Sequence, residues 1–295
     1  MSAQLVLRDD HGPVVVLTLN CPDRRNALSR GLVAALGDAL DRLLIEHGPR
    51  VVILAGAGSV FCAGMDLKEA MERGTSASAE KDAVADVQAI ADLINQVHRF
   101  PKPTIAALDG DALGGGAGLA GACDFVLAAA GARIGYPEVR RGLVAAVVLR
   151  DLVRQVGDRR ARELLLTGQP LAADEAERWG LINRVVAHGS CLPAARELAR
   201  ELLESAPQAV ATTKQQLDEA TARPIDLRGA AAVSAAVRIA DEAREGMRAF
   251  LEDRPPLWSA EPPPSRLAEG RRRDAGIDEA LPNFGARDPG PAPGA

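Results

Sequence analysis

Short apolar runs alternate along this chain with longer segments of helical periodicity, and that alternation constrains the fold more than any other feature. The runs are rich in Val, Ile, Leu and Ala, as expected for strands buried on both faces of a parallel sheet. They cover residues 50–54, 104–108 and 125–128, and the amphipathic segments cover residues 29–47 and 80–100. Strand–helix–strand order of this kind predicts an α/β fold with a mainly parallel sheet and crossover helices.

The two ends of the chain depart from this alternation. Residues 4–19 hold two apolar runs around a cluster of turn-forming residues, which predicts a hairpin. From residue 142 to about residue 250 the pattern is helical, apart from one last strand predicted over residues 181–186. Prolines and the run Arg271–Arg273 then mark a C-terminal tail. A tail of this composition cannot offset its ordering entropy, so we expect it to be disordered from about residue 260.

Composition and charge exclude several classes of protein. The formal net charge of −5 argues against a binder of phosphate backbones, and an aromatic content of 3% argues against base stacking. No apolar run approaches the roughly 20 residues of a membrane-spanning helix, and the N-terminus lacks the features of a signal peptide. The four cysteines and four histidines have no metal-ligand spacing. We therefore expect a reduced, cytoplasmic protein that binds no metal, nucleic acid or membrane.

Three segments carry residues that could support chemistry, namely residues 61–68, 109–119 and 135–140. The second contains Gly114–Gly118, which follows a strand and predicts a tight turn that opens a helix. The unpaired N–H groups of a helix's first turn lie at its positive dipole end, where they can hold a developing anion. Taken alone, these glycines are equally consistent with a packing turn.

A competing interpretation is a dinucleotide-binding loop. Gly116–Gly121 matches the pattern G-x-G-x-x-G, and Glu138 follows about 20 residues later. Residues 124–127, however, already form the next predicted strand, which leaves room for only a turn or two of helix. A Rossmann crossover needs a full helix packed on the sheet, so we reject this interpretation.

Glu138 lies between a predicted strand and an apolar run. Partial burial there would raise the pKa of its carboxyl group towards the range that suits a general acid or base. A lone glutamate in a loop is nevertheless a surface residue most of the time, so this position alone is a weak indication of catalysis.

Further short motifs occur along the chain in a fixed order. They are Asn26-Ala27-Leu28, Phe61-Cys62-Ala63-Gly64-Met65-Asp66-Leu67, Gly114-Gly115-Gly116-x-Gly118-Leu119 with Cys123-Asp124, Pro137-Glu138-Val139, Leu166-Thr167-Gly168, Gly180-Leu181-Ile182-Asn183-Arg184-Val185-Val186 and Phe250-Leu251-Glu252-Asp253-Arg254-Pro255. In this order they resemble the enoyl-CoA hydratase/isomerase (crotonase) superfamily, and the resemblance spans about residues 4–258.

The resemblance implies a crotonase-like spiral of ββα units over residues 1–190, which would hold an acyl-CoA site. A helical oligomerisation region over residues 191–258 would build homotrimers, often paired as a dimer of trimers, and residues 259–295 would form the tail. The substrate would be an acyl-CoA thioester. Coenzyme A would be part of that substrate, and no separate cofactor is implied.

The resemblance also implies roles for individual residues. The backbone N–H groups of Met65 and Gly115 would hold the thioester oxygen as an oxyanion hole, and Glu138 would be the catalytic acid and base. Losing one donor of an oxyanion hole typically costs about 2.7–4 kcal/mol of transition-state stabilisation. The substrate-binding positions would be Arg24, Arg25, Ala63, Asp66, Leu67, Lys68, Gly114 and Gly118.

One position departs from the fatty-acyl hydratases of that superfamily, which usually carry two catalytic glutamates. Gly118 stands where one of them would be, so only Glu138 is matched. A single carboxylate suits proton transfer between C2 and C4 of a 3-enoyl thioester, the reaction of an isomerase. Gly118 and the residues after Glu138 instead resemble single-glutamate hydratases of methylglutaconyl-type CoA esters. We favour a hydratase, with an isomerase or a catalytically silent acyl-CoA-binding relative as alternatives.

Overall fold

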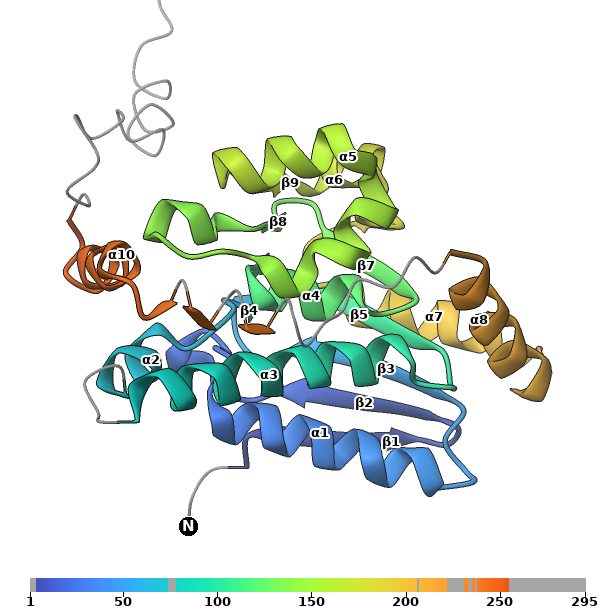
Figure 1. Cartoon of the computed structure of the whole chain (residues 1–295). Coiled ribbons are helices and arrows are strands. Elements are labelled where there is room, and N and C mark those ends of the chain that lie inside the picture. The colour runs from blue at the N-terminus through green and yellow to red at the C-terminus, as the bar shows by residue number, and fades with distance from the viewer. Residues whose placement is uncertain are drawn as a thin grey trace, which may run out of the picture. The chain divides into compact units, whose positions relative to one another are not determined.

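The N-terminal hairpin begins a six-stranded sheet in the computed structural model (Figure 1). Its strands are β1 (Val6–His11), β2 (Val14–Leu19), β3 (Val51–Gly56), β5 (Thr104–Leu108), β7 (Phe125–Ala129) and β10 (Arg184–Val186), and they lie in the order β1-β2-β3-β5-β7-β10. Only the pair β1 and β2 is antiparallel, while the other neighbours run parallel. The predicted α/β fold with a mainly parallel sheet and an N-terminal hairpin is therefore confirmed.

The structure describes residues 4–73, 78–205, 207–221, 231–232, 235–236 and 238–254. All of them belong to one compact unit, residues 1–256. The tail predicted over residues 259–295, with Arg271–Arg273, lies outside the described residues, as does much of residues 222–237. The boundaries predicted within the chain, at residues 190 and 258, remain predictions.

A second, four-stranded sheet accompanies the first, and the sequence analysis missed it. It consists of β4 (Val60–Cys62), β6 (Asp111–Leu113), β8 (Arg133–Gly135) and β9 (Leu171–Ala172), in the order β4-β6-β8-β9. The successive pairs β3–β4, β5–β6 and β7–β8 each send one strand to the large sheet and the next to the small one. Strands of two or three residues carry no readable periodicity, which explains why they escaped prediction.

Helices fill the connections between the strands. They are α1 (Arg30–Ile45), α2 (Leu67–Arg73), α3 (Ala79–His98), α4 (Gly115–Gly121), α5 (Leu149–Thr167), α6 (Ala173–Trp179), α7 (Cys191–Leu203), α8 (Pro207–Thr221) and α10 (Asp241–Leu251), with the 3₁₀ turns η1 (Pro22–Arg24), η2 (Pro137–Arg141) and η3 (Ala146–Val148). The Ser29 hydroxyl accepts a hydrogen bond from the backbone N–H of Leu32, so Ser29 is the N-cap of α1 as its residue type favours. In the part of the chain that the structure describes, no helix is both long and apolar enough to cross a membrane.

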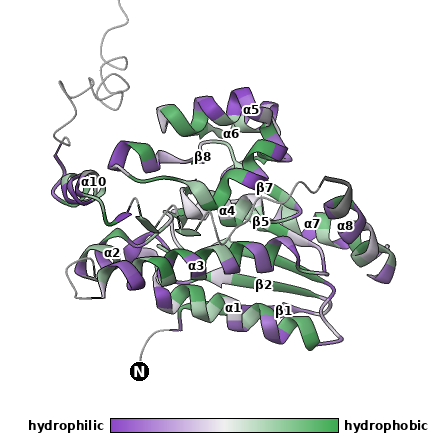
Figure 2. Cartoon of the chain, in the orientation of Figure 1, coloured by the Kyte–Doolittle hydropathy of each residue, from purple (hydrophilic) through white to green (hydrophobic). Residues whose placement is uncertain are grey.

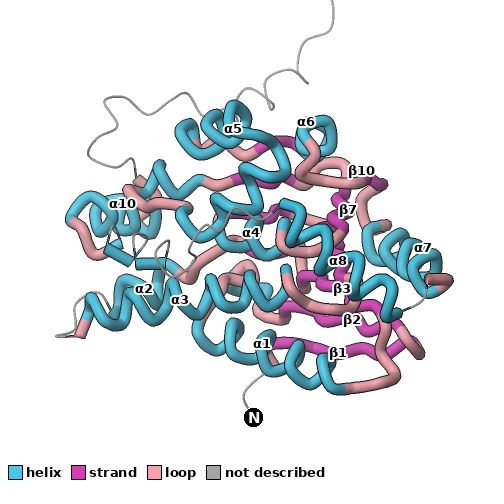
Figure 3. Tube along the Cα trace, turned by 45° about the vertical axis from the view of Figure 1, so that its right-hand side comes forward, coloured by secondary structure: helices cyan, strands magenta, loops and turns pink. Residues whose placement is uncertain are grey.

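The core lies between the helices and the large sheet. Helix α1 packs beside α3 and against β1 and β2, whereas α7 contacts β3, β5 and β7. Figure 3 shows the large sheet between α3 and α7, and Figure 2 shows that β2 is mostly hydrophobic along its length. Strand β5 is buried at every position, as expected for a central strand of a parallel sheet.

The last strand is shorter than predicted, because it begins at Arg184 rather than at residue 181. The residue just before it explains the difference. The side-chain oxygen of Asn183 accepts a hydrogen bond from the backbone N–H of Val126, and the Asn183 backbone N–H donates to the Val126 carbonyl. One of these two hydrogen bonds involves the Asn183 side chain. The regular backbone pairing of β10 with β7 therefore starts only at Arg184.

Candidate active site

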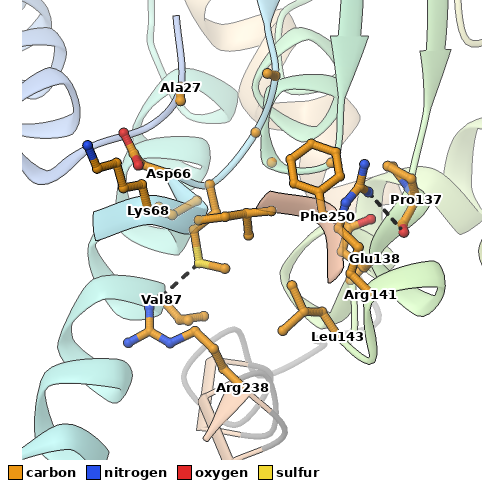
Figure 4. Close-up of a pocket in the computed structure, with 18 of the residues that line it drawn as sticks. Ala27, Asp66, Lys68, Val87, Pro137, Glu138, Arg141, Leu143, Arg238 and Phe250 are labelled. Carbon is orange, nitrogen blue, oxygen red and sulfur yellow. Dashed lines mark hydrogen bonds between the residues drawn. The ribbon is translucent and has the colours of Figure 1, made fainter. Parts of the chain in front are cut away.

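A cavity of about 310 Å³ opens between α2, α3, the start of α4, η2 and α10. Ten of the eleven residues singled out in the sequence line it, namely Arg24, Arg25, Ala63, Met65, Asp66, Leu67, Lys68, Gly114, Gly115 and Glu138. Figure 4 shows Glu138 on one side of this cavity, with Lys68 and Val87 on the other. The fold therefore gathers three segments that lie far apart in the chain around one space.

The backbone N–H groups of Met65 and Gly115 lie at the cavity, and neither has an acceptor among the described residues. Met65 follows Gly64, whose φ of +86° turns the chain and whose carbonyl accepts a hydrogen bond from Leu28 at 2.8 Å. Gly115 is the first residue of α4, where an N–H has no intrahelical partner. A Cβ on Gly115 would lie only 3.9 Å from the Met65 nitrogen, so the two donors are close neighbours.

Gly114 precedes the donor Gly115 in the chain and lies close to the carboxyl group of Glu138. Its φ of +56° is in the left-handed region that favours glycine, and its N–H donates to the Gly135 carbonyl at 2.8 Å. A Cβ at this position would lie 2.8 Å from Oε1 of Glu138. Both the backbone conformation and the close approach of Glu138 therefore require glycine at position 114.

Glu138 lies in the 3₁₀ turn η2, and its backbone carbonyl accepts a hydrogen bond from Leu143 at 3.0 Å. The residue keeps some solvent exposure, but its Oε2 is buried and has no hydrogen-bond partner among the described residues. Desolvation disfavours the charged form and raises the pKa of Glu138 to about 7, while a hydrogen bond from its own backbone N–H and the charge of Arg141 oppose this shift. A carboxyl group with a pKa near 7 can both accept and return a proton at neutral pH.

Gly118 is the one predicted site residue that does not line the cavity. It is buried inside α4, and a Cβ built there would lie 2.4 Å from Cγ1 of Val148 and 3.2 Å from Cδ1 of Ile94. The predicted contact of Gly118 with the substrate stays a prediction. Side chains from η3 and α3 fill the space into which a residue at position 118 would extend.

Asp66 is a second acidic residue at the cavity, but its carboxylate has structural partners. Its Oδ1 accepts a hydrogen bond from the backbone N–H of Glu69 at 3.0 Å, at the start of α2, and its Oδ2 forms an ion pair with Arg24. These contacts hold the Asp66 side chain in place. Glu138 is thus the acidic side chain at this cavity that has no charged partner within ion-pair distance among the described residues.

The loop that carries Arg24 and Arg25 is fixed by a buried side chain. Asn26 has a φ of +51°, and its amide group makes three hydrogen bonds, with the backbones of Cys21, Ala57 and Val60. The Arg25 carbonyl in turn accepts a hydrogen bond from Ala63. Arg25 and Lys68 then contribute two positive charges to the lining of the cavity, where an anionic group of a ligand could bind.

Arg141, Arg238 and Phe250 are among the lining residues that the sequence analysis did not assign to the site. Arg238 is 5% exposed, pairs with Asp86 at 3.3 Å and donates a hydrogen bond to the sulfur of Met65 at 3.6 Å (Figure 4). Phe250 comes from α10, more than a hundred residues after η2. Only the spacing of Arg141, three residues after Glu138 in a short turn, could have indicated that it shares the cavity.

The described residues include no group of three or more His, Cys, Asp or Glu side chains that could hold a metal ion. The buried thiol of Cys62 is not a candidate nucleophile, because desolvation raises its pKa to about 12. The chemistry that this arrangement can perform is proton transfer by one carboxyl group beside two backbone donors for a developing oxyanion.

Comparisons with known proteins point to the same chemistry. The family model for enoyl-CoA hydratase/isomerase matches residues 9–261. The chain is 43% identical to a Thermus thermophilus protein named "Putative enoyl-CoA hydratase", over 84% of this chain and 98% of that one. It is 37% identical to an enoyl-CoA isomerase/hydratase of Mycosarcoma maydis, over 82% and 91% of the two chains. The crystal structure of an enoyl-CoA hydratase from Mycobacterium avium matches with a TM-score of 0.77 and 35% identity, over 87% of this chain and 99% of that one.

Proposed function

The chain belongs to the enoyl-CoA hydratase/isomerase family, and from that premise we propose that this enzyme adds water across the 2,3 double bond of an enoyl-CoA thioester. An acyl-CoA thioester is the substrate class consistent with that family. The observation that carries the proposal is the single desolvated carboxyl group of Glu138 beside the free backbone N–H groups of Met65 and Gly115.

In the proposed mechanism, the thioester oxygen accepts hydrogen bonds from the N–H groups of Met65 and Gly115. The oxygen of a water molecule adds to C3, and the ionised Glu138 takes one proton from that water. The electrons of the double bond move to the thioester oxygen, where the two N–H donors stabilise the enolate. Glu138 then returns its proton to C2 as the carbonyl re-forms. Atoms balance, because the product contains the substrate and one water molecule.

We assign binding of the coenzyme A part to cations that line the cavity. Arg25 and Lys68 supply positive charge for its phosphates, and Arg24 adds a guanidinium that Asp66 holds in position. Ala63 and Leu67 contribute small and apolar surface between these cations. We include in this proposal the predicted substrate-binding roles of the residues that line the cavity.

An isomerase is the second candidate, and the packing at Gly118 favours it. Val148 and Ile94 occupy the space beside Gly118, so no carboxylate from α4 can help to hold the attacking water. Moving a proton from C4 to C2 through the same enolate needs only Glu138. We retain the hydratase as the first candidate because the relatives and solved structures cited above carry hydratase names, one of them jointly with isomerase.

Oxygen-18 water distinguishes these reactions. We would incubate the enzyme separately with a short 2-enoyl-CoA and its 3-enoyl isomer in labelled water and follow both by mass spectrometry. A hydratase incorporates the label at C3 of the 2-enoyl substrate, whereas an isomerase converts the 3-enoyl ester without taking up label. Tight binding of both esters without any turnover would instead indicate a silent acyl-CoA-binding protein and contradict the proposal.

The remaining expectations accompany this proposal as predictions. They are a branched acyl group of the methylglutaconyl type, a homotrimer or a dimer of trimers built by the helices after residue 190, and a cytoplasmic location. Native mass spectrometry of the full chain measures the oligomeric state directly.

A further inference from the structure

Leu28 is the last residue of the motif Asn26-Ala27-Leu28 and lies shortly before helix α1. Its side chain is 4% exposed and does not line the cavity, whereas that of Ala27 does. A role for Leu28 in the site must therefore come through its contacts with other residues. Those contacts are with the two backbone donors, Met65 and Gly115, which come from different segments of the chain.

The backbone of Leu28 pairs with the chain around Met65. The two residues face each other in a parallel β-bridge. The Leu28 N–H donates to the carbonyl of Gly64 at 2.8 Å, and the Leu28 carbonyl accepts a hydrogen bond from the N–H of Asp66 at 3.5 Å. In a parallel pairing a residue bonds to the two neighbours of the residue opposite, so the N–H of Met65 is directed away from Leu28. This pairing therefore fixes the direction of the first donor.

The side chain of Leu28 reaches the second donor. A Cβ built on Gly115 would lie 3.1 Å from Cδ1 of Leu28, closer than an ordinary van der Waals contact. The next side-chain atom, Cγ2 of Ile90, would lie 3.7 Å away, and the Met65 nitrogen 3.9 Å away. A methyl group of Leu28 therefore packs against the first residue of α4, and Leu28 is the side chain closest to this donor.

The chain on both sides of Leu28 is held in place. Before it, the buried amide group of Asn26 makes its three hydrogen bonds to the backbone. After it, the Ser29 hydroxyl caps α1 by accepting a hydrogen bond from the N–H of Leu32 at 3.3 Å. Leu28 therefore has a fixed position between these two anchors, from which it can hold both donors.

We propose that Leu28 is a positioning residue that sets the separation of the two oxyanion donors. Its backbone holds the loop of Met65, and its side chain holds the start of α4 at Gly115. Both donors must lie within hydrogen-bond distance of one oxygen atom, and misplacing a reacting group by about 1 Å can cost about 100-fold in rate. The inference rests on the proposed function, because it explains how the donors of that reaction are held.

The test compares the same truncation at two buried leucines. Leu28→Ala removes the methyl groups that pack against Gly115, and Leu28→Val removes them with a smaller loss of volume, in case the alanine variant does not fold. Leu36→Ala is the matched control, because Leu36 is fully buried in α1 and does not line the cavity. Both alanine variants lose the same buried atoms, so thermal unfolding should show a loss of stability in each.

Steady-state kinetics with a short 2-enoyl-CoA separates positioning from packing. In Leu28→Ala we expect kcat to fall by about 10- to 100-fold with little change in KM, because Leu28 does not line the cavity. Leu28→Val should lose less, and Leu28→Met should retain most of the activity, since this exchange conserves volume. Leu36→Ala should leave both constants near their wild-type values. Wild-type kcat in a folded Leu28→Ala or Leu28→Val enzyme would overturn the inference, as would an equal loss in Leu36→Ala.

A spectroscopic measurement separates this inference from the proposed reaction. Butanoyl-CoA labelled with carbon-13 at C1 is saturated and needs no turnover, and infrared difference spectra against the unlabelled ester report its carbonyl stretch on the enzyme. Hydrogen bonds to the thioester oxygen lower this frequency, so the wild-type enzyme and Leu36→Ala should lower it, whereas in Leu28→Ala it should return towards the value of the free ester.

The two proposals fail in different ways in this experiment. A frequency that stays lowered in Leu28→Ala would contradict the inference, even in an active hydratase. A frequency that returns in Leu28→Ala but not in Leu36→Ala would support the inference, even if no enoyl ester were hydrated. An unshifted carbonyl in the wild-type enzyme would contradict the donor roles of Met65 and Gly115, and with them both proposals.

Discussion

The cavity has two walls that differ in the groups they contribute: one contributes backbone N–H groups and the other contributes side chains. On the glycine wall, formed by Met65, Gly114 and Gly115 with the buried Gly118 behind them in α4, the chain contributes backbone N–H groups, and the packing leaves little room for added side chains. On the acidic wall, formed by Pro137–Arg141, the side chains of Glu138 and Arg141 face the cavity. The first wall should therefore respond to substitutions that add volume, and the second to substitutions that change charge or proton affinity at constant volume.

The largest expected effect is on the acidic wall. Glu138→Gln keeps the size of the side chain but removes the proton acceptor, so turnover of an enoyl-CoA should fall by about 10²- to 10⁴-fold. Steady-state kinetics measures this loss, and circular dichroism checks that the variant folds. Near wild-type turnover in a folded Glu138→Gln enzyme would remove Glu138 from the mechanism.

The same substitution should increase stability in a pH-dependent way. Burial raises the pKa of Glu138 from 4.5 to about 7, so the folded state binds the proton more tightly than the unfolded state does. The stability of the wild-type protein should therefore decrease as the pH rises from about 4.5 to about 7 because of this group. Glu138→Gln removes that decrease, which amounts to about 3 kcal/mol above pH 7.

Denaturant unfolding of both proteins at pH 5 and pH 8 measures this difference. The stability advantage of Glu138→Gln should be small at pH 5 and large at pH 8. An advantage that is equal at both values would mean that the carboxyl group of Glu138 is not desolvated in the folded protein.

The glycine wall should respond to volume. Gly118→Ala places a Cβ 2.4 Å from Cγ1 of Val148, and overpacking of this kind typically costs about 1–3 kcal/mol. In a Val148→Ala background the contact with Cγ1 is gone and only the tighter-than-usual contact with Cδ1 of Ile94 at 3.2 Å remains, so Gly118→Ala should cost less there. A double-mutant cycle by thermal unfolding measures the coupling between the two positions.

Gly121→Ala is the control within the same helix, because a Cβ there meets only the Gln155 amide at 3.4 Å, an ordinary contact. This variant should be as stable as the wild-type protein or more so. Equal effects of Gly118→Ala with and without Val148 would show that Val148 does not fill the space beside Gly118.

The smallest effect is expected where a side chain of the glycine wall changes but its backbone donor remains. Met65→Ala keeps the backbone N–H group proposed to hold the thioester oxygen, so kcat should change by less than about tenfold, whereas loss of an oxyanion donor costs about 10²–10³. The KM can change, because the Met65 side chain also lines the cavity and contacts Arg238. A drop in kcat as large as that of Glu138→Gln would contradict a backbone role for Met65.

Much of the fold could be predicted because long elements have clear periodicity. In helix α1, which is capped by Ser29, apolar residues keep helical spacing over several turns. The buried strands β3, β5 and β7 are each apolar over most of their length. Strands such as Val60–Cys62 have only three residues, so their pairing depends on the spiral as a whole and not on their own sequence. The end of the chain lies outside the described residues, and its predicted disorder stays a prediction.

The residues of the candidate site also fall into those that the sequence could indicate and those that it could not. Met65, Gly115 and Glu138 lie in motifs that a resemblance could indicate, and the structure places them around one cavity. The role of α10 could not be predicted, because its packing is tertiary: a Cβ on Gly246 would lie 2.1 Å from the Arg141 carbonyl, so the helix crosses η2 in direct contact. That contact brings Phe250 over Arg141, and no local pattern in either segment encodes it.

The central claim is that one carboxyl group, Glu138, performs the proton transfers of this site. Its most direct test is the pH dependence of kcat/KM for an enoyl-CoA, which reports the ionisation of the free enzyme. We predict that kcat/KM rises through a single ionisation near pH 7 to a plateau, and that this ionisation disappears in Glu138→Gln. A wild-type profile that is flat from pH 6 to pH 8, or a Glu138→Gln enzyme that retains the ionisation, would contradict the account.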